Sequence, residues 1–270
     1  MSQNSIKSYY ASGVEKDRLQ KDYFKLEGIR TKEIISRYLQ VDPLKILDVG
    51  GGIGFYAFWL KSLGHEVTLV DLSANNIAWA KEYAAEKNLF LDGYKVGDTG
   101  GLRFPDDQFD LVLLLGPLYH LTDRADRIKA IVEAKRVLKP NGLLIAAVIS
   151  RYASLMDGFK RNLIADEQFV AILTHDLNTG IHINNTENFE YFTTAFFHTP
   201  DEIENEIREC NLNFEKIIAV ESLGWLLDDV LRTSDTAHTE LICSLIRQVE
   251  ENKDLMASSP HILAIARKLN

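Results

Sequence analysis

The segment Ile46–Gly54 limits what this chain can fold into more than any other stretch. A run of apolar residues leads to Asp48, and three glycines then follow at Gly50, Gly52 and Gly54. Apolar residues at helical spacing come next. A strand, a glycine-rich turn and a helix in this order are typical of a loop that binds a nucleotide-like ligand, because glycine allows a sharp turn and places no Cβ in the ligand's way.

The spacing of these glycines argues against a dinucleotide enzyme. The dinucleotide fingerprint is G-x-G-x-x-G, and Phe55 stands where its last glycine would be. That fingerprint also lacks an acid two residues before the first glycine, where this chain has Asp48. A nicotinamide-dependent dehydrogenase is therefore the disfavoured alternative.

Strand and helix patterns alternate as far as residue 150. The predicted strands are Lys45–Val49, His65–Asp71, Phe90–Val96, Leu111–Leu115 and Leu143–Ile149. Three helices are predicted. The first has Phe58, Trp59 and Leu63 on one face and stops at Gly64, and the second runs from a Ser73 cap to about Lys87. The third starts at a Thr122 cap, stops at Lys139–Gly142, and has Ile128, Ile131, Val132 and Leu138 on its buried side. Such alternation with short links implies an α/β fold of parallel strands joined by right-handed crossovers.

Three motifs of this region resemble those of the class I S-adenosylmethionine-dependent methyltransferases. Asp48–Gly54 resembles motif I, Phe104–Val112 resembles the segment that leads into the fourth strand, and Arg136–Gly142 resembles the block before the fifth. The resemblance implies a seven-stranded Rossmann-like methyltransferase sheet with helices on both faces. It also implies an antiparallel final strand, which we place at His261–Arg267. Specific motifs cover about residues 45–150, and the remainder matches by pattern alone.

The resemblance implies that S-adenosylmethionine is the cofactor and S-adenosylhomocysteine the product. Asp71 ends the second strand, where a carboxylate can accept hydrogen bonds from both ribose hydroxyls. Asp98 occupies the position whose acid commonly accepts from the adenine amino group. Asp48 is expected to hold the amino-acid end, mostly through water or backbone. The predicted cofactor contacts are Asp48, Gly50, Gly52, Gly54, Asp71, Leu72, Asp98, Thr99, Leu115 and Tyr9.

The segment after the fourth strand is the predicted catalytic position, because open α/β sheets bind ligands at the carboxyl ends of their strands. His120 is the candidate general base for a hydroxyl or ammonium acceptor, since imidazole titrates near neutrality. Tyr119 is expected to orient the acceptor. The alternative is that both side chains shape the pocket by packing.

The regular alternation stops after residue 150. Residues 151–198 are rich in aromatic side chains and histidine, and we predict that they form a lid inserted over a small, partly apolar or aromatic acceptor. The predicted acceptor contacts are Arg151, Tyr152, His175 and Tyr191. The guanidinium of Arg151 would suit a substrate carboxylate. No metal is expected, because His175, His182 and His198 lack a recognisable ligand spacing.

The chain thus divides into four predicted parts. Residues 1–40 form an N-terminal helical cap, 41–150 the cofactor-binding core, 151–198 the lid, and 199–270 the C-terminal part of the core with a helical excursion. Thr199–Glu202 is a capping box with proline in the first turn of a helix. A strand at 214–220 and a mainly helical stretch at 222–257 precede the final strand.

Composition restricts the partners. A formal net charge of −9 without a clustered basic segment disfavours nucleic acid. Two distant cysteines and the lack of an apolar leader predict a reduced, cytoplasmic protein. Its apolar runs are too short to span a membrane. We expect a monomer or a homodimer.

The predicted function is transfer of a methyl group from S-adenosylmethionine to O, N, S or C of a small metabolite. A tRNA or protein methyltransferase is the first alternative, disfavoured by the acidic balance and by an enclosing lid. A non-catalytic protein that binds the cofactor is the second, because a fold does not settle a function. Such a protein would need no second pocket for an acceptor, so the predicted lid favours the enzyme.

Overall fold

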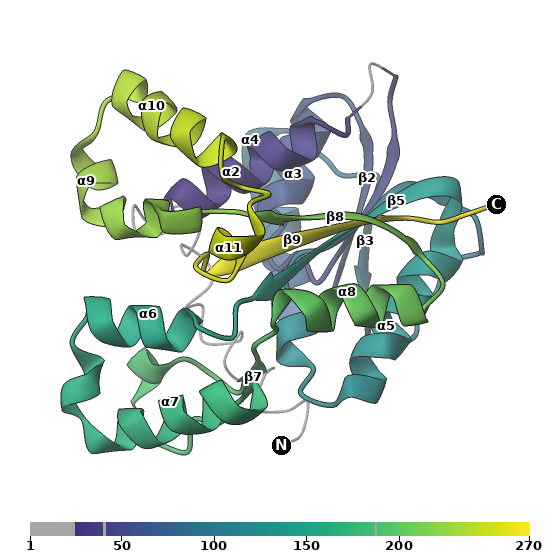
Figure 1. The fold of residues 1–270 in the computed structure, drawn as a ribbon. Coiled ribbons are helices and arrows are strands. Elements are labelled where there is room, and N and C mark those ends of the chain that lie inside the picture. The colour runs from purple at the N-terminus through teal and green to yellow at the C-terminus, as the bar shows by residue number, and fades with distance from the viewer. Residues whose placement is uncertain (1–24, 40–41, 187) are drawn as a thin grey trace.

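The computed structural model describes residues 25–39, 42–186 and 188–270 (Figure 1). Its centre is a seven-stranded sheet with the strand order β3-β2-β1-β4-β5-β9-β8. The parallel strands are β1 (Lys45–Val49), β2 (Glu66–Asp71), β3 (Gly93–Val96), β4 (Phe109–Leu114) and β5 (Leu138–Ile149). β9 (His261–Arg267) runs antiparallel to β5 and to β8 (Asn213–Ala219). The predicted sheet and its antiparallel final strand are confirmed.

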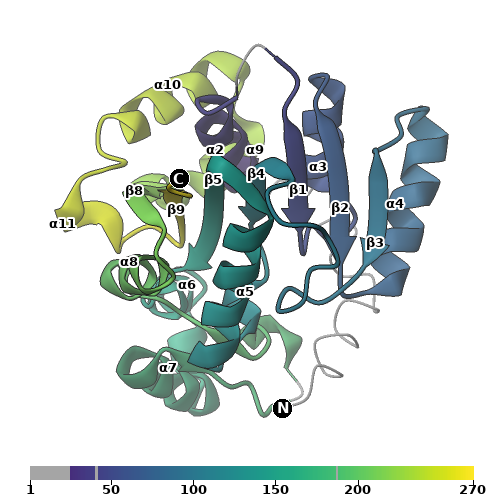
Figure 2. The ribbon, with the colours of Figure 1, turned by 90° about the vertical axis from the view of Figure 1, so that its right-hand side faces the viewer.

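Helices cover both faces of the sheet, as Figure 2 shows for α3 and α5. The helices on one face are α2 (Lys25–Ser36), α3 (Phe55–Ser62) and α4 (Ala74–Lys87), and those on the other are α5 (Arg124–Val137) and α8 (Pro200–Glu209). In β1, Ile46 packs toward the first group, whereas Leu47 and Val49 pack toward the second. Both faces are buried along β1, β2, β4 and the second half of β5, so these strands are mainly apolar, and this burial is the main stabilising contribution.

Two positions predicted on the apolar faces of helices are wrong. Leu63 is 51% exposed and Val132 is 43% exposed. α5 instead turns Ala130, Ala134 and Val137 toward the sheet. Ile131 is buried on the same face and Ile128 packs against the same core, as predicted, so of the predicted positions only Val132 lies on the outer side of this helix.

Element boundaries also differ from the prediction. The N-cap of α5 is Asp123, whose side chain accepts a hydrogen bond from the Ala125 N–H at 2.8 Å, and not Thr122. β3 begins at Gly93 and not at Phe90. The carboxylate of Asp92 accepts a hydrogen bond from the Val67 N–H at 2.8 Å and so occupies a donor of the neighbouring strand.

The cap predicted at residues 1–40 is described only in part, as α2. The predicted cofactor contact Tyr9 lies outside the described residues. α2 packs its Leu26 against α10 (Thr236–Arg247) and α9 (Asp228–Thr233). None of the helices in the described ranges combines the length and apolar character that a bilayer crossing requires.

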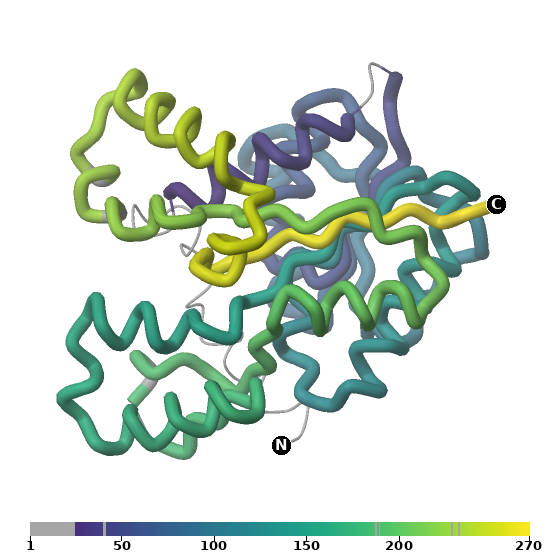
Figure 3. The backbone as a smooth tube through the Cα atoms, viewed as in Figure 1, coloured from purple at the N-terminus to yellow at the C-terminus, as the bar shows by residue number. Residues whose placement is uncertain are grey.

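Two excursions leave the sheet at the end where β5 stops (Figure 3). Residues 151–198 contain α6 (Ala153–Lys160), α7 (Glu167–Thr179), β6 (Ile181–His182) and β7 (Ala195–Phe196). They have a small hydrophobic cluster of their own, built around Phe169, Leu173 and Tyr191. The second excursion holds α9, α10 and α11 (Lys253–Met256) between β8 and β9. That the first covers an acceptor stays a prediction.

The capping box of α8 forms as expected. Thr199 Oγ1 accepts from the Glu202 N–H at 3.3 Å, and the Glu202 carboxylate accepts from the Thr199 N–H at 2.7 Å. A fully buried ion pair lies farther along α8 and joins this helix to α5. Arg127 Nη2 lies 2.8 Å from Glu206 Oε1, and His198 Nε2 lies 3.3 Å from Glu206 Oε2.

This buried pair gives a prediction about stability. Glu206→Gln should lower the free energy of unfolding by about 3 kcal/mol or more, because it leaves the charge of Arg127 buried without its counter-ion. Glu209 lies on the same helix and pairs with Arg124 in solvent. Glu209→Gln should therefore cost less than ~1 kcal/mol. Urea unfolding of both variants tests this, and equal losses would contradict it.

Candidate active site

The glycine loop lies between the end of β1 and the start of α3. Gly50 and Gly52 have φ values of +69° and +59°, which side chains other than glycine rarely adopt. A Cβ at Gly50 would overlap with Pro117, whereas a Cβ at Gly52 would have no atom within 4 Å. Gly50 is therefore a packing requirement, and Gly52 borders open space in which a ligand could lie.

The carboxylate of Asp71 joins three parts of the site. Its Oδ2 accepts from the Gly52 N–H at 2.9 Å, and its Oδ1 accepts from the Ser73 N–H at 2.8 Å and from Asn76 Nδ2 at 3.0 Å. Burial raises the pKa of Asp71 above its usual range, and these hydrogen bonds oppose the rise. A carboxylate can accept about four hydrogen bonds, so Asp71 retains capacity for a ligand hydroxyl.

The carboxyl group of Asp48 lies beneath the loop. A Cβ at Gly51 would overlap with its Oδ2. Burial, with a further contribution from the neighbouring Asp71, raises the pKa of Asp48 to about 7. Neither oxygen accepts a hydrogen bond of ordinary geometry from the described residues, and the amide of Ala57 offsets only part of the shift. The protonation of Asp48 is therefore sensitive to any charge that binds above the loop.

The other predicted cofactor contacts follow neighbouring strands. Asp71 is paired with Val96, the last residue of β3, so Asp98 and Thr99 lie near it at the same edge. Asp98 is exposed, and its Oδ1 accepts from the Gly100 N–H at 2.7 Å. Leu72 and Leu115, after β2 and β4, are partly buried at this edge. The strand order brings these residues together, and their binding roles remain predictions.

The segment after β4 packs on the glycine loop. It forms a single turn, η3 (Leu118–His120), and a Cβ at Gly116 would lie 3.2 Å from the carbonyl oxygen of Gly50 and 3.6 Å from the Tyr119 hydroxyl. The ring of Tyr119 is buried, and its centroid is 4.6 Å from that of His120. Tyr119 therefore lies near the glycine loop with His120 against its ring, and the catalytic roles of both remain predictions.

The predicted acceptor contacts do not form one group. Arg151 Nη2 lies 2.7 Å from both carboxylate oxygens of Glu202, so a substrate carboxylate would have to displace Glu202. The Tyr191 hydroxyl donates to Asp166 at 2.6 Å, and His175 Nδ1 lies 2.6 Å from the carbonyl oxygen of Ile181. The contacts of Tyr191 and His175 stabilise the segment 151–198 itself, whereas that of Arg151 joins the segment to α8. Tyr152 is exposed.

The histidines of this region are engaged separately. His182 Nδ1 lies 2.8 Å from Asp176, His198 Nε2 lies 3.3 Å from Glu206, and His175 Nδ1 lies 2.6 Å from the carbonyl oxygen of Ile181, so each ring has a different partner. Sequence reasoning missed another pair at the carboxyl edge, in which His261 Nδ1 lies 2.6 Å from Glu221 Oε1. Each residue adjoins a strand end, but their separation along the chain gave no signal that they meet.

Known proteins share this architecture. A family described as the methyltransferase domain matches residues 47–146. A ubiquinone biosynthesis O-methyltransferase from Bartonella tribocorum is 36% identical over 110 residues, which are 41% of this chain and 43% of that relative. The chain therefore spans less than half the length of that relative.

Solved structures show the same fold. A methyltransferase dependent on S-adenosylmethionine from Methanosarcina mazei superposes with a TM-score of 0.60 at 23% identity, covering 87% of this chain and 97% of that one. The 1,6-didemethyltoxoflavin-N1-methyltransferase of Burkholderia thailandensis, solved with S-adenosylhomocysteine, gives 0.58 at 14% identity, covering 99% and 87%. A methyltransferase domain thus matches residues 47–146, and the strand order and the solved structures show that the chain has the fold of the class I S-adenosylmethionine-dependent methyltransferases.

Proposed function

We propose that this chain transfers the methyl group of S-adenosylmethionine to an oxygen of a small, partly apolar molecule. The observation that carries the proposal is the loop in which Gly52 faces open space while Asp71 holds its backbone N–H. A side chain at this position would fill the space that the cofactor needs. The name of the Bartonella relative supports a hydroxyl group as the acceptor.

The chain's own residues would have separate roles in this reaction. The cofactor supplies a methyl group on a positively charged sulfur. Asp71 would orient it through a ribose hydroxyl, and Asp48 would favour its positive charges from below. η3 would exclude water from the reacting atoms, and His120 would remove the proton of the acceptor hydroxyl.

Turnover is the direct test. The purified chain is incubated with S-adenosylmethionine and a panel of phenols, catechols, amines and thiols, and S-adenosylhomocysteine is measured by mass spectrometry. Production that depends on a phenol or catechol supports the proposal. Binding of the cofactor without turnover on any class would favour the non-catalytic alternative.

Cofactor affinity gives a sharper prediction. Gly52→Val should abolish binding by filling the open space beside the loop, and Asp71→Ala should weaken it by about 1–3 kcal/mol through loss of a charged acceptor. Gly64→Val is the matched control, because Gly64 also has a positive φ and open surroundings but ends α3 at the opposite edge of the sheet. Calorimetry on the folded variants decides. Equal affinity in Gly52→Val and Gly64→Val would contradict the assignment.

The buried carboxyl of Asp48 predicts that the stability of the ligand-free protein depends on pH. Its pKa is about 7 in the folded chain against an ordinary value of 3.8, so the folded state holds the proton more tightly. The stabilisation is complete below about pH 4 and is lost as the pH rises through about 7, by up to ~4 kcal/mol. Asp48→Asn should remove this dependence in urea unfolding. A difference between the two proteins that does not change with pH would refute it.

The last prediction for this site concerns His120. If it is the general base, His120→Ala should lower turnover by ~10²-fold or more with cofactor affinity unchanged. His120→Gln should be almost as damaging, because an amide keeps the polarity but cannot take the proton. The wild-type rate should also rise over the pH range in which an imidazole loses its proton. Substantial activity in the Gln variant would show that His120 only positions the acceptor.

A further inference from the structure

Three potential metal ligands from distant parts of the chain meet at the carboxyl edge of the sheet. Glu27 belongs to α2, Glu221 follows β8, and His261 opens β9. One ligand atom from each lies within 4.8 Å of those from the other two. We call these three residues the edge cluster.

Two of its members are held rigidly. Glu221 is buried, and its Oε1 lies 2.6 Å from His261 Nδ1. Its Oε2 accepts from the His261 N–H at 3.1 Å and from Ser259 Oγ at 3.0 Å. Ser259 Oγ in turn accepts from the Glu221 N–H at 3.1 Å. The carboxylate and the imidazole therefore hold their positions relative to each other before any ligand binds.

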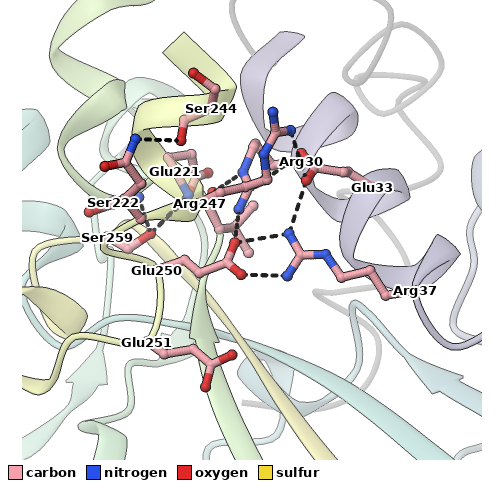
Figure 4. A network of polar contacts seen from close by, with 12 residues as sticks. Arg30, Glu33, Arg37, Glu221, Ser222, Ser244, Arg247, Glu250, Glu251 and Ser259 are labelled. Carbon is pink, nitrogen blue, oxygen red and sulfur yellow. Dashed lines mark hydrogen bonds and ion pairs between the residues drawn. The ribbon is translucent and has the colours of Figure 1, made fainter. Parts of the chain in front are cut away.

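The third member is held through its helix. Arg30, three residues after Glu27, is completely buried, and its Nε donates to the carbonyl oxygen of Val220 at 3.2 Å. Val220 directly precedes Glu221. The guanidinium of Arg30 also pairs with Glu33 and Glu250, which fixes α2 against the end of β8 (Figure 4). These contacts keep Glu27 within reach of Glu221.

We propose that the edge cluster binds one divalent transition-metal ion. Two carboxylates with one imidazole suit Mn²⁺, Fe²⁺ or Zn²⁺, whereas Mg²⁺ and Ca²⁺ prefer oxygen ligands alone. With bonds of about 2.1 Å, ligand atoms around such an ion are ~3 Å apart when adjacent and ~4.2 Å apart when opposite. The ligand atoms of the edge cluster lie within 4.8 Å of one another, close to this range. Three protein ligands leave coordination positions open.

The location gives the ion a role that rests on the proposed function. His261 is paired with Ile149, the last residue of β5, and so lies on the acceptor side of the sheet. α2 connects the edge cluster to the cofactor side, since a Cβ at Gly28 would lie 3.7 Å from the ring of Phe55 at the start of α3. Acceptor oxygens would occupy the open positions, and the ion would favour transfer of the hydroxyl proton to a general base. An acceptor with two adjacent oxygens fits this arrangement best.

The test is Mn²⁺ binding to the full chain after removal of metals with a chelator, followed by electron paramagnetic resonance without cofactor or acceptor. The wild type should bind one ion per chain, and Glu27→Gln and His261→Gln should each weaken binding at least tenfold. Glu66→Gln and His238→Gln are matched controls on exposed residues outside the cluster and should bind as the wild type does. Thermal unfolding confirms that each variant folds, with Glu27→Gln the least disruptive because its side chain is not fully buried.

Each outcome decides the proposal. Absence of stoichiometric binding by the wild type, or equal binding by folded Glu27→Gln and His261→Gln variants, overturns the metal site. The proposed function fails separately, since Mn²⁺ binding without methyl transfer to any acceptor leaves the site intact. If the wild type binds no Mn²⁺ and the chelator-treated enzyme keeps its full turnover, the metal site is ruled out and the methyltransferase function stands.

Discussion

The hydrogen bonds of the Asp71 carboxylate are the interaction on which the candidate site depends. One carboxylate fixes the glycine loop through Gly52, the turn after β2 through Ser73, and the start of α4 through Asn76. The loop after β4 then packs on the glycine loop, because Pro117 leaves no room for a side chain at Gly50. Asp71 thus combines a structural role with its predicted ligand role, and a cofactor would add to contacts that already exist.

Much of the fold could be predicted because its core is local in sequence. Each parallel strand except β3 contains a short apolar run and is followed by a helix, and the turn residues mark the boundaries. The errors at Leu63 and Val132 arise because helix periodicity alone does not say which apolar side the sheet covers. The start of β3 was wrong because Asp92, a residue of the preceding turn, takes a hydrogen bond that would otherwise extend the strand pairing.

Only part of the candidate site could be located from the sequence. Asp48, the glycine loop and Asp71 could be predicted because motif and strand end coincide. The acceptor side could not. Arg151 and Tyr191 were chosen by residue type, and their partners Glu202 and Asp166 lie 51 and 25 residues away along the chain. The edge cluster joins Glu27 to two residues more than 190 positions later in the chain, and periodic patterns in the sequence do not predict such a contact.

The antiparallel strand β9 has a consequence for how the chain folds during synthesis. β8 pairs with β9 and has no direct pairing with the parallel strands, because β9 lies between β8 and β5. On the ribosome, the first five strands can pair as they emerge, but β8 must wait for residues 261–267 before it gains a neighbour. Until then β5 exposes an unpaired edge, and the apolar residues Ile217 and Ile218 of β8 lack their partners. Completion of the sheet is thus a late, long-range step, of the kind that slows folding and lengthens exposure to aggregation.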